Sequence, residues 1–256
     1  MITLTTDFGL NDPYTAQMKG VIYTLNPNAK IIDITHGVDK FNIRMGAFML
    51  ASAAPYFPAG TIHVAIVDPG VGTKRRAIVI QTQQAFFVGP DNGVLMLAAQ
   101  QQGIKQVYEL TNAKFRLPKV SNTFHGRDIF APAAAHIDNG ISVAEFGSEI
   151  THPLTPKFAS IQNLNGTITG QILYIDSFGN AITNIPSESI QTQTATVGLS
   201  QGLLKLALRE TYAQTNPNEA VALVGSHGFL ELALNQASFA KKYLVRIGDP
   251  VTVTFV

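Results

Sequence analysis

The strongest constraint on the fold is a change of pattern near residue 150. Before it, short β-branched runs alternate with runs whose apolar residues recur at helical spacing. After it, only short strand-like runs remain, separated by Gly, Asn, Ser and Pro. The first pattern is typical of an α/β layer with a largely parallel sheet, and the second of a small antiparallel sheet or barrel. The sequence therefore predicts an α/β domain over residues 1–150, a linker over 151–165 and a smaller, all-β, barrel-like domain over 166–256.

The runs also give expected element positions. In the first domain, strands are expected at 2–6, 31–34, 61–67, 77–81 and 85–88, the last two as a hairpin, with helices at 13–25, 43–54, 94–102 and 129–137. Asp12 is the expected N-cap of the first helix, with Pro13 at its first helical position. In the second domain, strands are expected at 167–175, 181–184, 195–199, 203–208, 220–224 and 251–255. The run 230–235 fits either a strand or a helical turn.

Composition narrows the class of protein. Hydrophobic residues make up 46% and charged residues 14% of the chain, which is a globular composition, and the net charge of +1 gives no reason to expect nucleic acid or an anionic membrane as a partner. The chain has no cysteine, which excludes disulfides, thiolate nucleophiles and Cys-ligated metals. None of its six histidines is spaced as in a zinc motif such as HExxH. The first residues lack the features of a signal peptide, no run approaches a membrane span, and we expect a cytoplasmic protein.

Four polar, Gly-rich segments follow strand-like runs in the first domain. They are TDFG at 6–9, VDPGVGTKRR at 67–76, GPDNG at 89–93 and FHGRD at 124–128. In open α/β sheets, ligands bind beyond the carboxyl ends of the strands. The four segments therefore suggest one shared site.

Each segment also has a purely structural interpretation. Asp7 can cap the following turn, and Asp91 with its neighbours fits turn chemistry better than catalysis. Arg75, by contrast, lies seven residues after Asp68, and two glycines stand between them, so Arg75 can fold back to pair with Asp68. His125 precedes an expected helix start, and Gly126 gives it room.

Two segments of the second domain are similarly open to interpretation. In the run 176–180 (DSFGN), Phe178 can stack on a flat ring while Asp176 and Asn180 offer hydrogen bonds, but the residues alone favour a hairpin turn with Phe178 in the core. The run 225–228 (GSHG) is either a polar loop around an anionic group or another turn. The residues by themselves thus indicate a two-domain protein that acts on a small molecule.

Taken together, six motifs carry a family resemblance. TTDFG, VDPGVGTKRR, PDNG, FHGRD, DSFGN and SHGFLELALNQ occur in this order over nearly the whole chain. The set resembles the S-adenosyl-L-methionine hydroxide adenosyltransferase family, which is related to the fluorinase and chlorinase enzymes. The resemblance implies hydrolysis of S-adenosyl-L-methionine to adenosine and L-methionine without metal or cofactor. It also implies a homotrimer whose active sites lie between the N-terminal domain of one subunit and the C-terminal domain of a neighbour.

The resemblance assigns roles residue by residue. It implies that Asp68, Arg75 and His125 form the catalytic, water-activating trio. The substrate-binding residues that it implies are Asp7 for the ribose hydroxyls, Phe41 behind the sugar, Gly126 beside His125, Asp176 near the methionine amino group, Phe178, Asn180 and Tyr212 for adenine, and Ser226 at the methionine end.

The chain departs from the halogenases of this group at several points. They have Tyr where this chain has Asp68, Ser where it has Gly126, and an extra loop where residues 81–91 are short. These differences argue against a halide pocket. His227 stands where the fluorinase has Arg, which leaves its role at the substrate carboxylate open.

Three other functions are to be weighed. A metal-dependent nucleoside hydrolase would use Asp7 and Asp12 as ligands, since hard cations prefer carboxylate oxygens. A non-catalytic protein that binds S-adenosyl-L-methionine or a nucleoside would keep Asp7, Phe178 and Asn180 but would not need Asp68, Arg75 and His125 together. A halogenase would form a 5′-halo product.

Overall fold

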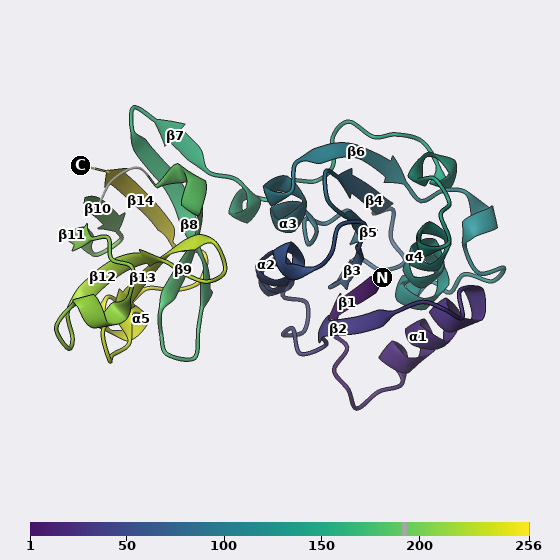
Figure 1. Cartoon of the computed structure of the whole chain (residues 1–256), viewed down its shortest axis with the longest axis horizontal. Helices are drawn as coiled ribbons and strands as arrows, with labels where there is room; N and C mark the ends of the chain where they lie inside the picture. The colour runs from purple at the N-terminus through teal and green to yellow at the C-terminus, as the bar shows by residue number, and fades with distance from the viewer. Residues whose placement is uncertain (191–193, 256) are drawn as a thin grey trace. The chain divides into compact units, whose positions relative to one another are not determined.

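The computed structural model of the protein describes residues 1–190 and 194–255. The chain divides into two compact units, Met1–Thr155 and Pro156–Val256, and each has its own sheet and its own hydrophobic core (Figure 1). Within the described ranges, no helix is long and apolar enough to cross a membrane.

The sheet of the first unit is mixed. Its strand order is β2-β1-β3-β5-β4-β6, where the strands are β1 (Ile2–Thr6), β2 (Ile31–Thr35), β3 (Ile62–Ile66), β4 (Ala77–Thr82), β5 (Phe86–Pro90) and β6 (Ile104–Glu109). β1 is parallel to β2 and to β3, and β3 is parallel to β5. β4 is antiparallel to both of its neighbours. The expected hairpin is therefore confirmed as β4–β5, whereas the expectation of a largely parallel sheet needs the correction that one interior strand is reversed.

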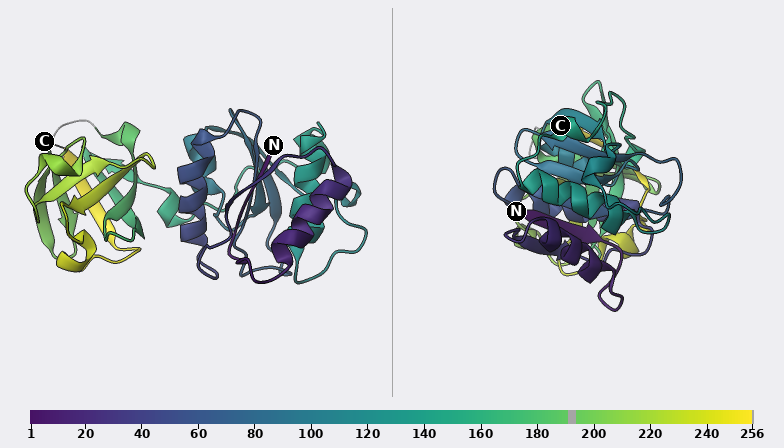
Figure 2. Two further views of the ribbon diagram at one scale, coloured as in Figure 1. Left: turned by 60° about the horizontal axis from the view of Figure 1, so that its bottom comes forward. Right: turned by 90° about the vertical axis from the view of Figure 1, so that its right-hand side faces the viewer.

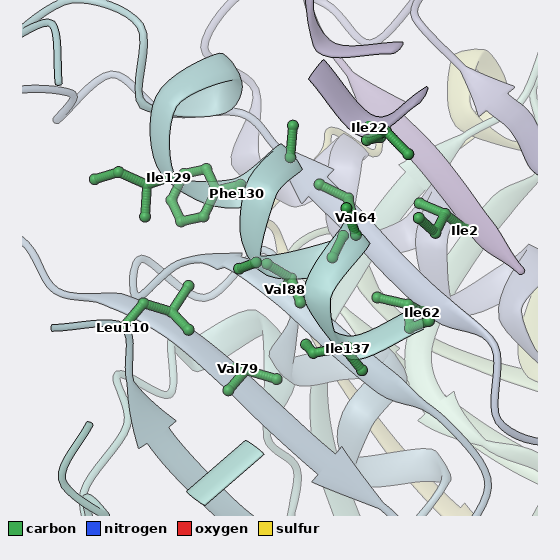
Figure 3. Packing of buried hydrophobic residues seen from close by; sticks show 14 of the residues in the cluster. Ile2, Ile22, Ile62, Val64, Val79, Val88, Leu110, Ile129, Phe130 and Ile137 are labelled. Atoms are coloured by element: carbon green, nitrogen blue, oxygen red, sulfur yellow. The ribbon is translucent and has the colours of Figure 1, made fainter. Parts of the chain in front are cut away.

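Helices cover both faces of this sheet. They are α1 (Tyr14–Leu25), α2 (Ile43–Ala53), α3 (Met96–Gln101) and α4 (Ala131–Asp138). α1 packs beside α4 on one face and α2 beside α3 on the other, which gives three layers (Figure 2). Figure 3 shows the apolar contacts between sheet and helices at Ile2, Val64, Val88, Ile22, Phe130 and Ile137.

Local chemistry explains where some helices begin. The Asn42 side chain accepts a hydrogen bond from the backbone N–H of Met45 and so caps α2. At α1, Pro13 itself is the N-cap residue and no side chain caps the helix, so the expected cap by Asp12 is wrong. A π-helix, Gly126–Phe130, directly precedes α4, so the helical segment starts earlier than expected from the apolar run.

The second unit is a nearly closed, antiparallel, barrel-like sheet. Its order is β11-β10-β14-β8-β9-β13-β12, with β7 paired to β8, and the strands are β7 (Gln162–Leu164), β8 (Thr167–Ile175), β9 (Ala181–Pro186), β10 (Thr194–Leu199), β11 (Gly202–Ala207), β12 (Ala220–Val224), β13 (Phe229–Leu234) and β14 (Pro250–Phe255). A bridge between Leu208 and Ala222 joins the segment after β11 to β12.

Three details of the second unit differ from expectation. The ambiguous run near 230–235 is strand β13, all six residues of which are buried. Part of the expected linker forms β7 at the edge of the sheet. A short helix, α5 (Phe239–Lys242), adds to the strands, and its Phe239 is fully buried in the core, so the unit is not purely β.

Candidate active site

Sheet topology brings the first set of predicted residues to one edge. β1 and β3 are parallel and in register, with Thr6 opposite Ile66, so Asp7 and Asp68 leave the sheet side by side. Because β4 is reversed, it begins at this same edge, where Ala77 pairs with Pro90. The connection from β3 to β4 therefore never crosses the sheet. The reversed strand is what returns Arg75 to the end of β3.

Arg75 forms the centre of a hydrogen-bonded trio. Its Nε lies 3.1 and 3.0 Å from the two carboxylate oxygens of Asp68, and its Nη2 lies 2.6 Å from Oδ2. The same Nη2 lies 2.8 Å from Nδ1 of His125. The guanidinium also lies over the ring of Phe130, at 5.3 Å from the ring centre. The predicted pair of Asp68 and Arg75 is therefore present. It is well shielded from water, because the Asp68 side chain is only 6% exposed.

Glycines allow the segments of this trio to approach one another. Gly72 has φ of 77°, and a Cβ there would lie 2.2 Å from the backbone oxygen of Asn122, so the loop after β3 packs directly on the segment before His125. A Cβ on Gly126 would meet the Phe124 ring at 3.0 Å and Ile66 at 3.3 Å. Gly126 thus lets the start of the π-helix, a feature often found at functional sites, lie close to the end of β3.

The electrostatics of His125 favour its neutral form. Burial lowers the pKa of His125, the positive charge of Arg75 lowers it further, and the charge of Asp68 opposes both. Arginine can only donate, so Nδ1 of His125 is the acceptor in the bond with Arg75. The neutral ring therefore carries its proton on Nε2. The trio offers a carboxylate acceptor and an imidazole N–H donor, held by one guanidinium.

One cavity of about 370 Å³ collects most of the predicted residues of the first unit. It is lined by Asp7, Phe41, Asp68, His125 and Gly126 among others. Arg75 does not line it and lies behind Asp68 and His125. Phe8, Tyr14 and Phe124 supply an aromatic wall, with ring centres 5.2 to 5.8 Å apart. A cavity of this kind, apolar with a few convergent polar groups, suits a small molecule.

Asp7 and Phe41 are coupled across this cavity. The Asp7 side chain accepts a hydrogen bond of 2.9 Å from the backbone N–H of Phe41, and Lys40 donates to the Asp7 carbonyl oxygen. Phe41 has φ of 65°, a costly conformation for an aromatic residue, and the residue is 69% exposed. Asp7 therefore does not cap the turn that follows it. It holds a strained residue over the cavity and keeps one carboxylate oxygen outside this bond.

The Asp91 segment has the structural role expected of it. Asn92 accepts from the backbone N–H of Val94, and Gly93 has φ of 97°, as the turn requires. Asp91 accepts from Arg76 and from the backbone N–H of Leu154. These contacts fix the β5–α3 connection.

A second cavity, of about 550 Å³, lies in the second unit. It is lined by Asp176, Phe178, Asn180 and Tyr212 among others. Asp176 closes its loop by accepting from the backbone N–H groups of Phe178 and Asn180, each at 2.9 Å, and from Nδ2 of Asn180 at 3.0 Å. Phe178 is 77% exposed, so the interpretation that placed it in the core is wrong.

Ser226 and one unpredicted residue complete the description. Ser226 is exposed in the turn between β12 and β13 and does not line this cavity. Glu231 of β13, which the sequence analysis missed, is 3% exposed and lies 2.7 Å from Oη of Tyr212 and 3.2 Å from Nε2 of His227. The overlooked signal is a single carboxylate inside the apolar run FLELAL, because a buried charge requires partners.

The residues of the metal-dependent alternative do not form a cluster in the described ranges. No three His, Asp or Glu side chains there lie close enough together to hold a metal ion. Asp12, the suggested partner of Asp7, is exposed.

Comparison with known proteins gives consistent results. The family model for the SAM hydroxide adenosyltransferase N-terminal domain matches residues 2–147, and the model for the C-terminal domain matches residues 170–252. A protein of Methanocaldococcus jannaschii named (R)-S-adenosyl-L-methionine hydrolase is 35% identical, over 100% of this chain and 96% of its own length. A crystal structure of an uncharacterized conserved protein from Thermotoga maritima matches with a TM-score of 0.85 and 36% identity, over 100% of both chains.

The halogenase branch is more distant. A fluorinase from an Actinoplanes species is 28% identical, over 99% of this chain and 97% of its own length. Both family models together cover most of the chain, and the relatives match along its whole length. The chain belongs to the SAM hydroxide adenosyltransferase family.

Proposed function

We propose that this protein hydrolyses S-adenosyl-L-methionine to adenosine and L-methionine. The observation that carries the proposal is the Asp68–Arg75–His125 trio, which borders a cavity also lined by Asp7. The full-length relative named as an (R)-S-adenosyl-L-methionine hydrolase supports it and suggests the (R) configuration at sulfur for the substrate.

The reaction places its demand on the nucleophile. The oxygen of water forms a bond to the 5′-carbon of the ribose while the bond from that carbon to sulfur breaks. The bonding pair goes to sulfur, which changes from a sulfonium cation to the neutral thioether of methionine. One proton is released from the attacking water. The leaving group needs no acid, so the site has only to orient the water and take its proton.

We assign these two tasks to different residues, on the basis of the hydrogen bonds within the trio. Nδ1 of His125 already accepts from Arg75, so His125 presents Nε2–H and orients the water as a donor. Asp68 is then the group that takes the proton, while Arg75 fixes its carboxylate and stabilises negative charge on the developing hydroxide. General-base assistance contributes about 10²- to 10⁴-fold, and alignment of the reactants contributes as much or more.

The remaining predicted residues would hold the substrate. In the first unit, the second carboxylate oxygen of Asp7 takes the ribose hydroxyls and the Phe41 ring covers the sugar. In the second unit, Phe178, Asn180 and Tyr212 contact adenine. Ser226, on the exposed turn between β12 and β13, contacts the methionine end. A carboxylate accepts about four hydrogen bonds. The three that Asp176 accepts within its loop leave it room for one ammonium group.

We further propose a homotrimer with active sites at the subunit interfaces, built from an N-terminal domain over 1–150 and a C-terminal domain over 166–256, and working in the cytoplasm. Each cavity holds only part of the predicted contact set, which supports a shared site. Mixed trimers of Asp68→Ala and Asn180→Ala subunits test this. Recovery of activity on mixing two inactive variants would support sites shared between chains, whereas no recovery in trimers shown to be mixed would refute them.

The reaction itself is tested in ¹⁸O-labelled water with EDTA-treated protein. We expect adenosine that carries the label, together with methionine, and faster turnover of the (R) epimer. Adenine release that requires metal would indicate a nucleoside hydrolase, binding without turnover a binding protein, and a halide-dependent 5′-halo product a halogenase. Asp68→Asn keeps the size of the side chain but removes the base, and it should lower kcat at least about 10²-fold.

A further inference from the structure

Glu231 is a buried carboxylate for which the proposed reaction has no role. It lies in β13, directly after a register shift between Phe229 and Glu231 in the pairing with β9. Such irregularities re-aim side chains and are common beside active sites. Its side chain is only 4% exposed, and its Oε1 accepts a 2.7 Å hydrogen bond from Tyr212 Oη.

The second partner of Glu231 is His227, and the direction of that bond follows from a third contact. The backbone N–H of Phe229 lies 3.2 Å from Nδ1 of His227 and donates to it. The proton of the neutral ring is therefore on Nε2, which lies 3.2 Å from Glu231 Oε2 and donates to that oxygen. Each carboxylate oxygen of Glu231 thus receives one side-chain donor.

The backbone around this pair is fitted to it. A Cβ on Gly225 would lie 2.3 Å from His227 Nε2 and 2.8 Å from Glu231 Oε2, so a side chain at residue 225 would push the two apart. The turn closes through the backbone N–H of Gly228, which donates to the Gly225 carbonyl. The contact between His227 and Glu231 therefore restricts residue 225 to glycine.

Tyr212 is held at both ends. Its backbone lies in a short 3-10 turn that is closed by a capping box between Thr211 and Gln214. Burial, the hydrogen bond to Glu231 and the charges of Glu231 and Asp176 raise the pKa of Tyr212, so the phenol remains a donor at any working pH. Tyr212 is 41% exposed and lines the cavity of the second unit.

We infer that Glu231 is a positioning residue for adenosine binding, which fixes the Tyr212 ring at the cavity and ties it to the turn that carries Ser226 and His227. The inference rests on the proposed function, because it names what prepares the nucleoside contact. A ring that is already fixed loses little conformational freedom when a base packs on it, whereas a free ring must be ordered at the expense of affinity. Glu231 therefore acts on affinity for adenosine and substrate, through Tyr212, and not on the chemical step.

A double-mutant cycle on Tyr212 and Glu231 tests the inference. Tyr212→Phe removes only a hydroxyl from a partly exposed loop, and Glu231→Ala removes its acceptor. Each variant should raise the dissociation constant for adenosine and the KM for S-adenosyl-L-methionine about tenfold, because each loses one hydrogen bond to a charged group. The kcat of each should stay within about twofold of the wild-type value. The double variant should bind adenosine about as tightly as the weaker-binding of the two single variants, since both substitutions remove the same contact. Glu231→Gln keeps one acceptor oxygen and should restore most of the affinity.

Controls separate positioning from general damage. Tyr23→Phe makes the same change on α1, where Tyr23 is 45% exposed, and should leave adenosine affinity unchanged. Adenosine affinity that is unchanged in Tyr212→Phe, or losses that multiply in the double variant, would overturn the inference even if Glu231→Ala fails to fold. Wild-type turnover in the same assay keeps the two proposals apart. Absent hydrolysis would remove the proposed function, while adenosine binding would still report on Glu231.

Discussion

Replacing Arg75 with lysine tests the trio more selectively than deleting one of its members. Lysine keeps the positive charge near Asp68 but has one compact donor group in place of a planar fork. Arg75 now serves both Asp68, through Nε and Nη2, and His125, through Nη2. An ammonium group cannot reproduce this two-sided geometry. The variant should therefore keep substrate affinity and lose turnover.

The size of the loss follows from the contacts. A hydrogen bond to a charged group contributes about 1.5 to 3 kcal/mol. Arg75→Lys should lose at least one such bond while the Coulomb attraction to Asp68 persists. If the lost bond matters only for orienting water in the transition state, kcat falls by about 10- to 100-fold and KM stays within about twofold. Steady-state assays at saturating and limiting S-adenosyl-L-methionine measure both.

The adjacent residue provides a matched control. Arg76 forms the same type of pair, with its Nε 2.7 Å from Asp91 Oδ2, but that pair fixes the β5–α3 connection and does not line the cavity. Arg76→Lys should lower the melting temperature and leave kcat nearly unchanged. If Arg75→Lys retains wild-type kcat, or if Arg76→Lys loses as much turnover as Arg75→Lys, the fork geometry is not what activates the water.

Three further predictions follow from the structure. The lowered pKa of His125 predicts that kcat/KM falls only when the pH drops below the ordinary histidine range near 6.5, because a protonated ring can no longer accept from Arg75. An acid limb above that range in the pH profile of kcat/KM would contradict this. His63 is fully buried and burial lowers its pKa to about 4, so denaturant titrations should show about 3 kcal/mol of stability lost as the pH falls from 6.5 to 4, and His63→Gln should remove this loss. Gly179 has φ of 85° and a Cβ there would lie 2.0 Å from Ser238 Oγ, so Gly179→Ala should lower the melting temperature and weaken adenosine binding. Gly140 has a similar φ of 87° but open space around it, so Gly140→Ala should show only the smaller effect of backbone strain on the melting temperature.

The sequence predicted elements well where burial and local chemistry agree. β1, β8 and β12 have the expected bounds because β-branched and apolar runs there end at polar or turn residues. β6 was missed because Lys105 and Gln106 are exposed and Ile104 is half-buried at the edge of the sheet, so the segment gives no clear apolar run. β13 stayed ambiguous for the opposite reason, since a segment that is buried on both faces has no alternation to distinguish strand from helix.

The candidate site was predictable to the extent that its contacts are local in sequence. Asp68 and Arg75 lie seven residues apart across two glycines, and the pair could be foreseen. The contact of Arg75 with His125 spans 50 residues and depends on the direction of β4, which no local pattern reveals. Glu231 was missed because its partners lie on two turns outside β13, Tyr212 before β12 and His227 between β12 and β13, while its neighbours within the strand are all apolar.

The trio also bears on why water, and not a halide, is the proposed nucleophile. Water must give up a proton and needs an acceptor, and Asp68 supplies a carboxylate that Arg75 holds in place. A halide needs only donors, and an anion 4 Å from a carboxylate is repelled by about 4 kcal/mol near a protein surface, which more than offsets the attraction of one hydrogen bond. The Arg75 charge reduces this repulsion, but its Nε and Nη2 donate to Asp68 and His125, and Arg75 does not line the cavity in which a halide would bind. Gly126 adds no hydroxyl donor, and its Cβ position is already crowded by Phe124 and Ile66, so introducing serine there would strain the wall before it could help bind an anion.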